Sequence, residues 1–460
     1  MTIAEGQRKW WILAAMSGVL GLVVLDETVV GVALASIGPD LQMSAKGTHW
    51  VVNAYFLTFT CLVAVGGRLA DSLGRRGFFV LGIAVFGLSS AAAGFAQNGA
   101  WLVAARAVQG MGAAILFPTS WAILTSAFLP EERGFAFGIQ TTVGGMFMAL
   151  GPLVGGSLSQ YASWRWIFWV NLPVVAAVAV IVWFAWAPHL QGKRSATEEG
   201  GIDWFGLGTL VGGLTALVVV LMEAEGWGWK APVTLVLAAA AIVLLALFVR
   251  IEIQRPNPLI ELNLLANPSF TGGVMSFFMF QWSKLAVFVF VALYLQEVLK
   301  DSPINAGWIV MVAILPTLLT SLFSGKSADR FGSRRPLTAG LFLQAAALIV
   351  VGFAMVKTSH ELIIAALVTW GAAMPFASVP ARRALMGAVP KAQQGEASGV
   401  NLTVQMLGGT IGVALCGTLR IVTGHYASLF FLTGALLLAM AFVAWSTIEH
   451  ERAECIRARP

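Results

Sequence analysis

Four charged residues stand inside strongly apolar stretches and are the side chains best placed to do chemistry. Asp26 and Glu27 interrupt the segment LVVLDETVVGVAL, while Arg106 and Lys284 are the cations of two other apolar stretches. A charge in such surroundings is normally turned to a polar cavity or to a partner. These four residues therefore offer proton transfer at the carboxylates and binding of polar or charged groups.

The composition identifies the surroundings of these residues. Of 460 residues, 58% are hydrophobic and 11% are charged, which is more apolar surface than one water-soluble core could bury. The formal charge of +6 comes from short basic clusters between apolar runs, a distribution that argues against nucleic-acid binding. The three cysteines have no CxxC or Cys/His spacing, so neither a disulfide framework nor a metal site is indicated.

A membrane-spanning helix needs about 20 mostly apolar residues, and the chain contains fourteen such runs. They cover residues 10–37, 49–66, 77–96, 100–125, 135–158, 166–187, 204–222, 231–250, 269–296, 306–324, 337–356, 361–380, 396–419 and 428–447. Pro375 and Pro380 make the twelfth run ambiguous. The runs are too long for β-strands and do not alternate, so they predict an all-α integral membrane protein. The first run, preceded by Arg8 and Lys9, is too long for a cleaved signal and should be retained as a span.

The basic residues predict the orientation of these spans. With both termini in the cytoplasm, the cytoplasmic connections and tails hold 20 of the 28 Lys and Arg, and the opposite side holds six. This positive-inside bias supports an even number of spans in the cytoplasmic membrane. The spans contain no Ser/His/Asp set, metal cluster or nucleotide loop, so we expect neither an enzyme nor catalytic residues. A membrane-embedded enzyme or a receptor is the alternative from another functional class.

The sequence repeats itself at an offset of 258 residues. The loop GGRLADSLGRR (66–76) recurs as SGKSADRFGSRR (324–335), and Trp50 falls on Trp308. Because the register barely drifts over four helices, we expect two six-helix bundles. The predicted bundles are residues 1–190 and residues 268–460, the second with a short cytoplasmic tail. Residues 191–267 would then insert a polar linker and two extra spans.

Five motifs in chain order resemble those of the fourteen-spanner drug:proton antiporters of the major facilitator superfamily, the EmrB/QacA type. They are LDETVVGVAL, GRLADSLGRR, RAVQGMGAA, LGPLVGG and WRWIFWVNLP. Ser72 and Phe147 depart from the pattern, because a basic residue and a glycine are usual there. The resemblance implies the major facilitator fold, with bundles related by pseudo-two-fold symmetry, a substrate site between them and alternating access. It also implies export of drugs in exchange for protons.

Two of these motifs have a physical interpretation of their own. The loop after the second span and its repeat supply a predicted conformational latch, made of Gly67, Asp71, Gly74, Arg75, Arg76 and Asp329. The arginine pair could equally be a signal that keeps the loop in the cytoplasm. In the fifth span, Gly151, Gly155 and Gly156 permit close helix packing and Pro152 permits a bend. Ordinary packing is the alternative to a role of this motif in export.

The helical face of Asp26 predicts a partner on another span. The other positions on that face, from 19 to 33, are apolar, and Glu27 is turned away by about 100°. The offset of 258 residues relates Asp26 to Lys284, so we expect these two to pair across the bundles in one conformation. Alternatively, Lys284 reaches the membrane surface or a carbonyl group and never meets Asp26.

Aromatic residues around Lys284 predict a substrate cavity. The face of Lys284 also carries Phe277, Phe280, Gln281 and Phe288. With Asp26, these residues would suit a flat, partly polar organic molecule. A stripe of phenylalanines is otherwise ordinary packing, and the polar members of the face are the argument for a pocket.

We therefore expect a proton-coupled exporter of small amphipathic organic compounds. Asp26 and Glu27 would carry protons, and Arg106 would tune the transfer or, alternatively, serve as a structural hydrogen-bond hub. A proton symporter or facilitator for a metabolite is the alternative function. We expect a monomer in the lipid bilayer that uses the proton gradient and no cofactor or metal. The identity and charge of the substrate do not follow from the sequence.

Overall fold

The computed structural model describes residues 5–129, 132–186, 203–255, 258–390 and 393–448. Over these residues the chain forms helices and no strand. Thirteen helical segments of the described parts are long and apolar enough to cross a membrane. The remaining predicted span forms α2 (Ala45–Leu73), a further helix of 29 residues. The prediction of an all-α membrane fold is thus confirmed.

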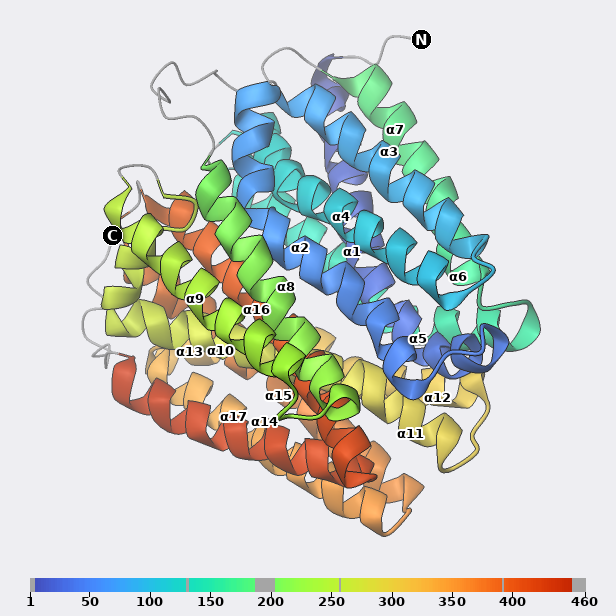
Figure 1. Ribbon diagram of the computed structural model, residues 1–460. Helices are drawn as coiled ribbons and strands as arrows, with labels where there is room; N and C mark the ends of the chain where they lie inside the picture. Colours follow the sequence, from blue (N-terminus) through green and yellow to red (C-terminus); the bar gives the residue numbers. More distant parts are fainter. Residues whose placement is uncertain (1–4, 130–131, 187–202, 256–257, 391–392, 449–460) are drawn as a thin grey trace. The chain divides into compact units, whose positions relative to one another are not determined.

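The helices belong to two compact units (Figure 1). Unit 1 comprises Met1–Leu207 and Asp301–Gly307. Its helices are α1 (Glu5–Asp40), α2, α3 (Arg75–Gly94), α4 (Gly99–Ala127), α5 (Arg133–Tyr161), α6 (Trp166–Trp169) and α7 (Asn171–Ala185). Within this unit α1 packs on α5, and α4 packs on both α2 and α3.

Unit 2 comprises Gly208–Lys300 and Trp308–Pro460. It holds most of α8 (Trp204–Trp227), α9 (Pro232–Gln254), η2 (Leu262–Ala266), α10 (Pro268–Leu285), η3 (Ala286–Val291), α11 (Ala292–Glu297), most of α12 (Pro303–Ile314), α13 (Pro316–Phe331), α14 (Arg334–Val356), α15 (His360–Gly387), α16 (Gln394–Thr423) and α17 (Tyr426–Thr447). The two predicted extra spans correspond to α8 and α9. The hydroxyl of Thr418 on α16 donates a hydrogen bond to the Leu221 carbonyl, which holds α8 in this unit.

The helix limits follow the sequence repeat. Helix α2 begins at residue 45 and ends at 73, and the pair α12–α13 begins at 303 and ends at 331, so both limits keep the offset of 258 residues. The glycines that follow, Gly74 and Gly332, have φ angles of 97° and 73°. Glycine adopts this left-handed backbone without steric cost, so it permits the tight connection predicted after the second span. The same connection recurs in unit 2.

Several predicted spans depart from a simple α-helix. Pro316 cannot donate a backbone hydrogen bond, and the predicted run 306–324 is divided there into α12 and α13. The run 269–296 contains η3, a π-helical segment of six residues directly after α10. Conversely, the ambiguous twelfth run forms the continuous helix α15 in spite of its two prolines.

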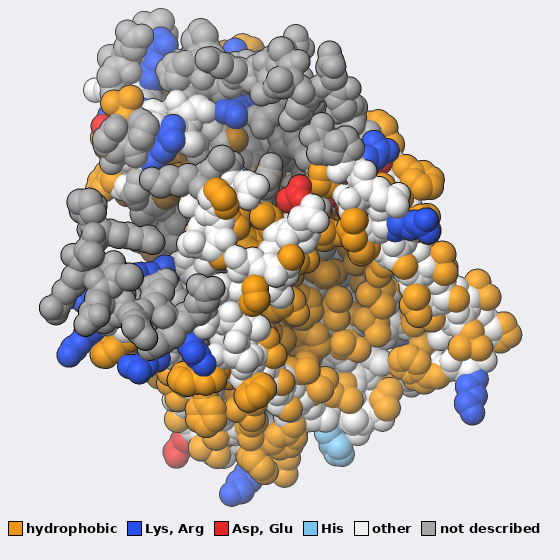
Figure 2. Space-filling view, turned by 90° about the vertical axis from the view of Figure 1, so that its left-hand side faces the viewer, with side chains coloured by type: hydrophobic (Ala, Val, Ile, Leu, Met, Phe, Trp, Pro, Cys, Tyr) orange, Lys and Arg blue, Asp and Glu red, His pale blue; other side chains and the backbone are white. Residues whose placement is uncertain are grey.

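Much of the molecular surface is apolar, as expected for contact with lipid. Figure 2 shows hydrophobic side chains over a broad part of one face, with Lys and Arg gathered mainly toward its edges. In unit 2, α9 exposes Val236, Ile242 and Val243. A helix that turns branched apolar side chains outward is stable in hydrocarbon but not in water.

Candidate functional site

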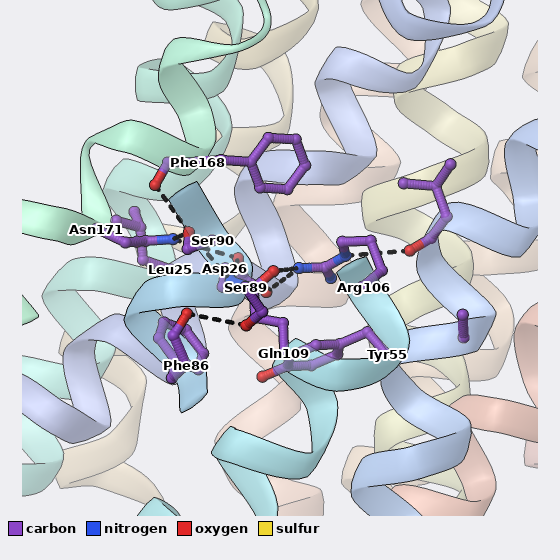
Figure 3. A network of polar contacts seen from close by, with 12 residues as sticks. Leu25, Asp26, Tyr55, Phe86, Ser89, Ser90, Arg106, Gln109, Phe168 and Asn171 are labelled. Atoms are coloured by element: carbon purple, nitrogen blue, oxygen red, sulfur yellow. Dashed lines mark hydrogen bonds and ion pairs between the residues drawn. The ribbon is translucent and has the colours of Figure 1, made fainter. Parts of the chain in front are cut away.

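Asp26 lies at the centre of a buried polar network in unit 1 (Figure 3). Its side chain has no exposed surface. Arg106 Nη1 donates to Oδ2 at 2.6 Å, and Gln109 Nε2 donates to Oδ1 at 2.9 Å. Asn171 Nδ2 makes a longer contact with Oδ1, at 3.4 Å. The carboxylate therefore accepts from three donors on α4 and α7.

The network continues through Ser90 of α3. Its hydroxyl accepts from Asn171 at 3.0 Å and from Gln109 at 3.3 Å, and it donates to the Phe168 carbonyl at 2.8 Å. On the other side, Arg106 Nε donates to the Val51 carbonyl of α2 at 3.1 Å. One connected set of hydrogen bonds thus joins α1, α2, α3, α4, α6 and α7.

Tyr55 of α2 completes the surroundings of the guanidinium group. The Arg106 Cζ atom lies 4.3 Å from the centre of the Tyr55 ring, a distance at which the ring face attracts a cation. The Tyr55 hydroxyl is buried and has no hydrogen-bond partner among the described residues. Tyr55, Ser90 and Asn171 were not predicted from the sequence, because single polar residues in apolar runs carry no distinctive spacing.

Small residues bring these helices close enough for the network to form. Arg106 and Gln109 are three positions apart, so they project from one face of α4. Gly110, the next residue, lies against the Tyr55 carbonyl and the Thr58 hydroxyl, where there is no room for a side chain. Because α4 can approach α2 this closely, the Arg106 side chain reaches a backbone carbonyl of α2.

The structure pairs Asp26 within its own unit. A partner on another span is what the helical face of Asp26 predicts, and that partner is Arg106 of α4. The predicted pairing with Lys284 joins residues of the two units and stays a prediction. Glu27 is also buried, with 5% of its surface exposed, but the hydrogen bonds that hold Asp26 come from other residues.

The glycines of LGPLVGG are points of close packing. Gly151 lies against Thr28 and Gly155 lies against the Val29 carbonyl, so both press α5 onto α1 just beyond Asp26. Gly156 lies against Pro303 and Ile304 at the start of α12, within unit 1. This packing is what the sequence motif predicted, and any role in the direction of transport stays a prediction.

Phe147, which stands where the motif usually has glycine, is accommodated by a glycine on the facing helix. A Cβ atom at Gly21 of α1 would come within 2.9 Å of the Phe147 ring. At this contact between α1 and α5, the large side chain is therefore on α5 and the glycine is on α1.

Part of the predicted latch is described. Gly67 and Asp71 lie outside the residues whose side chains the structure describes. Arg75 Nη1 donates to the Ser126 hydroxyl of α4 at 2.6 Å, and the Arg76 guanidinium lies 5.6 Å from the Trp183 ring. Thus the arginine pair binds neighbouring helices of unit 1.

In the repeat of this loop, Asp329 forms an ion pair with a residue of α15 in unit 2. Arg383 Nη1 lies 2.7 Å from Asp329 Oδ1. This ion pair is largely open to its surroundings, because Asp329 is 76% exposed, and its role as a latch stays a prediction.

The predicted cavity residues of unit 2 lie on α10 and η3. Gln281 is fully buried and its Oε1 accepts from Gln405 Nε2 of α16 at 3.3 Å. Phe277 and Phe280 meet edge to face, with ring centres 6.1 Å apart. Phe288 has no exposed surface and packs edge-on against Trp370, which favours packing over a pocket at that position.

Comparison with known proteins matches nearly the whole chain to one family. The family described as Major Facilitator Superfamily matches residues 16–300 and 270–459. The chain is 32% identical to "Puromycin resistance protein pur8" of Streptomyces alboniger, over 96% of this chain and 92% of that protein. It is 30% identical to "Tetracenomycin C resistance and export protein" of Streptomyces glaucescens, over 90% and 76%.

A solved structure shares the fold at low sequence identity. The "Crystal structure of D-xylose-proton symporter" superposes with a TM-score of 0.69 and covers 97% of this chain and 98% of that one, at 13% identity. Such a likeness concerns the arrangement of helices and says nothing about the substrate.

Proposed function

We propose that this chain, which belongs to the major facilitator superfamily, exports small amphipathic organic compounds across the cytoplasmic membrane in exchange for protons. It would then be a fourteen-spanner drug:proton antiporter of the EmrB/QacA type. The proposal is supported by the names of relatives that confer drug resistance. The observation that carries the proton coupling is the buried network around Asp26.

The pattern of donors indicates how a proton would act on this network. All three contacts to Asp26 are donated by N–H groups, so the carboxylate serves only as an acceptor. Oδ1 already accepts two of these contacts, so a proton there would displace one N–H donor, whereas a proton on Oδ2 would need an acceptor that none of the three donors supplies. Loss of the negative charge would also leave Arg106 without its counter-charge. Proton uptake therefore favours a different arrangement of α1 and α4.

Asn171 offers an acceptor for that proton. Its Oδ1 is buried and lacks a hydrogen-bond partner in the described structure, while its Nδ2 contacts both Asp26 and Ser90. Rotation of the amide group would turn Oδ1 toward a protonated Asp26 and withdraw Nδ2 from Ser90. The protonated carboxyl group would then have an acceptor in a second arrangement of the network, as a two-state switch requires.

The proton gradient is the only energy source in this proposal, and no cofactor is involved. Both termini would lie in the cytoplasm, and a monomer would suffice. The halves would alternate in giving access to the two sides of the membrane.

Transport by purified protein in liposomes tests the proposal. An imposed pH gradient should drive ethidium movement by the wild type, and Asp26→Asn should abolish it while the protein still folds. Asn keeps the shape of Asp but cannot load and release a proton. Asp40→Asn is the matched control, because Asp40 ends the same helix in a partly exposed ion pair with Arg165. Full gradient-driven transport by Asp26→Asn would overturn the coupling role, and Glu27 would be the next candidate.

A proton symporter for a metabolite is the second candidate. The observation in its favour is that the Asp26 network contains nothing that sets the direction of substrate movement. Vesicles with proton gradients of opposite direction separate the two functions. An antiporter accumulates label when protons leave the lumen, whereas a symporter accumulates it when protons enter.

A further inference from the structure

An arginine at the start of α14 has no acidic partner among the described residues of unit 2. Arg334 is the first residue of α14 and is half-buried, and none of the ion pairs between described residues includes it. Its Nε atom is buried and has no hydrogen-bond partner in the same part of the chain. A guanidinium group has five N–H donors, so one without a carboxylate is suited to bind an anion from outside the protein.

Trp445 of α17 holds this guanidinium group in place. The Arg334 Cζ atom lies 4.2 Å from the centre of the Trp445 ring, which is a stacking distance. The ring covers one face of the planar group, and the N–H donors lie in the plane, so stacking leaves them available. Because the side chain is already ordered, an anion that binds it has less conformational entropy to remove.

The residue before Arg334 adds a second unused donor. Ser333 is the N-cap residue of α14 and is 1% exposed, but it makes no side-chain capping bond, and its Oγ has no partner among the described residues. Buried polar groups are almost always paired, so this hydroxyl supports a ligand at the start of α14. The first N–H groups of a helix have no partner within the helix, and the helix dipole also favours an anion there.

The turn between α13 and α14 carries an excess of positive charge. Lys326, Arg330 and Arg335 are exposed. Residues 326–335 contain one carboxylate, Asp329, and Arg383 of α15 pairs with it. Basic clusters at the ends of membrane-spanning helices attract anionic lipid headgroups.

The apolar surroundings of Arg334 favour a lipid over a soluble phosphate compound. Leu438, Phe442 and Trp445 share one face of α17, because they follow one another at intervals of four and three residues. They are 36%, 73% and 46% exposed. An acyl chain can lie along this face while its headgroup stays at Arg334, whereas a soluble phosphate gains nothing from it.

The contact between arginine and tryptophan recurs in unit 1, without the hydroxyl. Arg76 has the position equivalent to Arg334 in the repeat, and its guanidinium lies 5.6 Å and 5.8 Å from the rings of Trp183 and Trp186. The position equivalent to Ser333 is occupied by Arg75, whose side chain binds α4. The unused hydroxyl is therefore a feature of unit 2.

We propose that Arg334, Ser333 and the start of α14 bind the phosphate group of an anionic phospholipid, with an acyl chain along the exposed face of α17. The guanidinium and hydroxyl groups donate to phosphate oxygens, and the basic turn stabilises the negative charge. This site depends on neither the substrate nor the direction of transport.

Native mass spectrometry of the purified protein in detergent tests the site. The probes are phosphatidylglycerol and phosphatidylcholine with the same acyl chains, and glycerol 3-phosphate, which has a phosphate group but no chain. The wild type should bind phosphatidylglycerol more tightly than either of the other two. Arg334→Gln should weaken phosphatidylglycerol binding about tenfold, the size expected for a hydrogen bond to a charged group. Trp445→Leu should weaken it too, because the guanidinium group is then no longer held.

Arg335→Gln is the matched control, because it removes the same charge from an exposed side chain one position along the chain. This variant should keep most of the wild-type affinity. If Arg334→Gln fails to fold, Arg334→Lys carries the test, since it keeps the charge but loses the planar set of donors.

The site would be overturned by equal binding of the two lipids to the wild type, or by wild-type affinity in Arg334→Gln. An equal loss in Arg335→Gln would also overturn it, because the general charge of the turn would then explain the binding. Glycerol 3-phosphate that binds as tightly as phosphatidylglycerol would assign the site to a soluble phosphate and refute the lipid.

Discussion

The ion pair between Asp26 and Arg106 should be costly to break from one side and much less costly to remove altogether. The two side chains are 0% and 1% exposed, and the atoms Oδ2 and Nη1 are 2.6 Å apart. Arg106→Met leaves a buried carboxylate with amide donors alone. Loss of one partner of a buried pair costs about 3–5 kcal/mol of unfolding free energy. The double variant Asp26→Leu/Arg106→Met contains no unpaired charge and should recover about 2–3 kcal/mol of the summed losses.

A double-mutant cycle measures this coupling energy. Unfolding of the purified protein by dodecyl sulfate, followed by tryptophan fluorescence, gives the four stabilities of the cycle. The control cycle uses Asp40 and Arg165, whose charged atoms are 2.8 Å apart but whose side chains are 47% and 30% exposed. Its coupling energy should stay within about 0–1 kcal/mol, because water screens the pair. Strictly additive losses for Asp26 and Arg106, or a coupling no larger than in the control, would refute the argument that the buried pair is a single energetic unit.

Three further predictions test individual side chains and the topology. Tyr55→Phe should retain gradient-driven ethidium transport, because the ring that faces the guanidinium is kept, whereas Tyr55→Leu should lose most of it; equal rates in liposomes would show that the ring is not needed. Gly151→Val should reduce the yield of folded protein in size-exclusion chromatography, while Gly138→Val on the same helix, where a Cβ atom meets nothing within 4 Å, should not; equal yields would dismiss close packing as the constraint. A cysteine at Trp227 should react with an impermeant maleimide from outside the cell and one at Ser195 should not; the opposite pattern would invert the proposed orientation.

The spans were predictable from the sequence because the apolar runs are long and the repeat keeps its register. The break at Pro316 was not predictable, because a proline breaks the helix there while α15 continues through two other prolines. The π-helical segment η3 was not predictable either. Local sequence does not distinguish these cases. Neighbouring helices decide whether the freed carbonyl groups find partners.

The need of Asp26 for a partner also followed from the sequence, but the identity of that partner did not. The repeat relates positions between the two halves, so it led to Lys284. The contact with Arg106 depends on the depth and closeness at which α1 and α4 pass each other, which the repeat does not reveal. Ser90 and Asn171 enter the network for the same reason. Their positions in three dimensions, not their spacing along the chain, make them part of the site.

The contact of Gly21 with Phe147 constrains the order in which these two residues could have evolved. An ancestor with the usual glycine at 147 could acquire glycine at 21 at the cost of a small gap between α1 and α5. Phenylalanine at 147 facing any larger residue at 21 would instead have forced a Cβ atom to within 2.9 Å of the ring. With α1 and α5 packed as they are, phenylalanine at 147 therefore requires glycine at 21. For the same reason, a descendant lineage cannot regain a side chain at 21 until 147 has become small again.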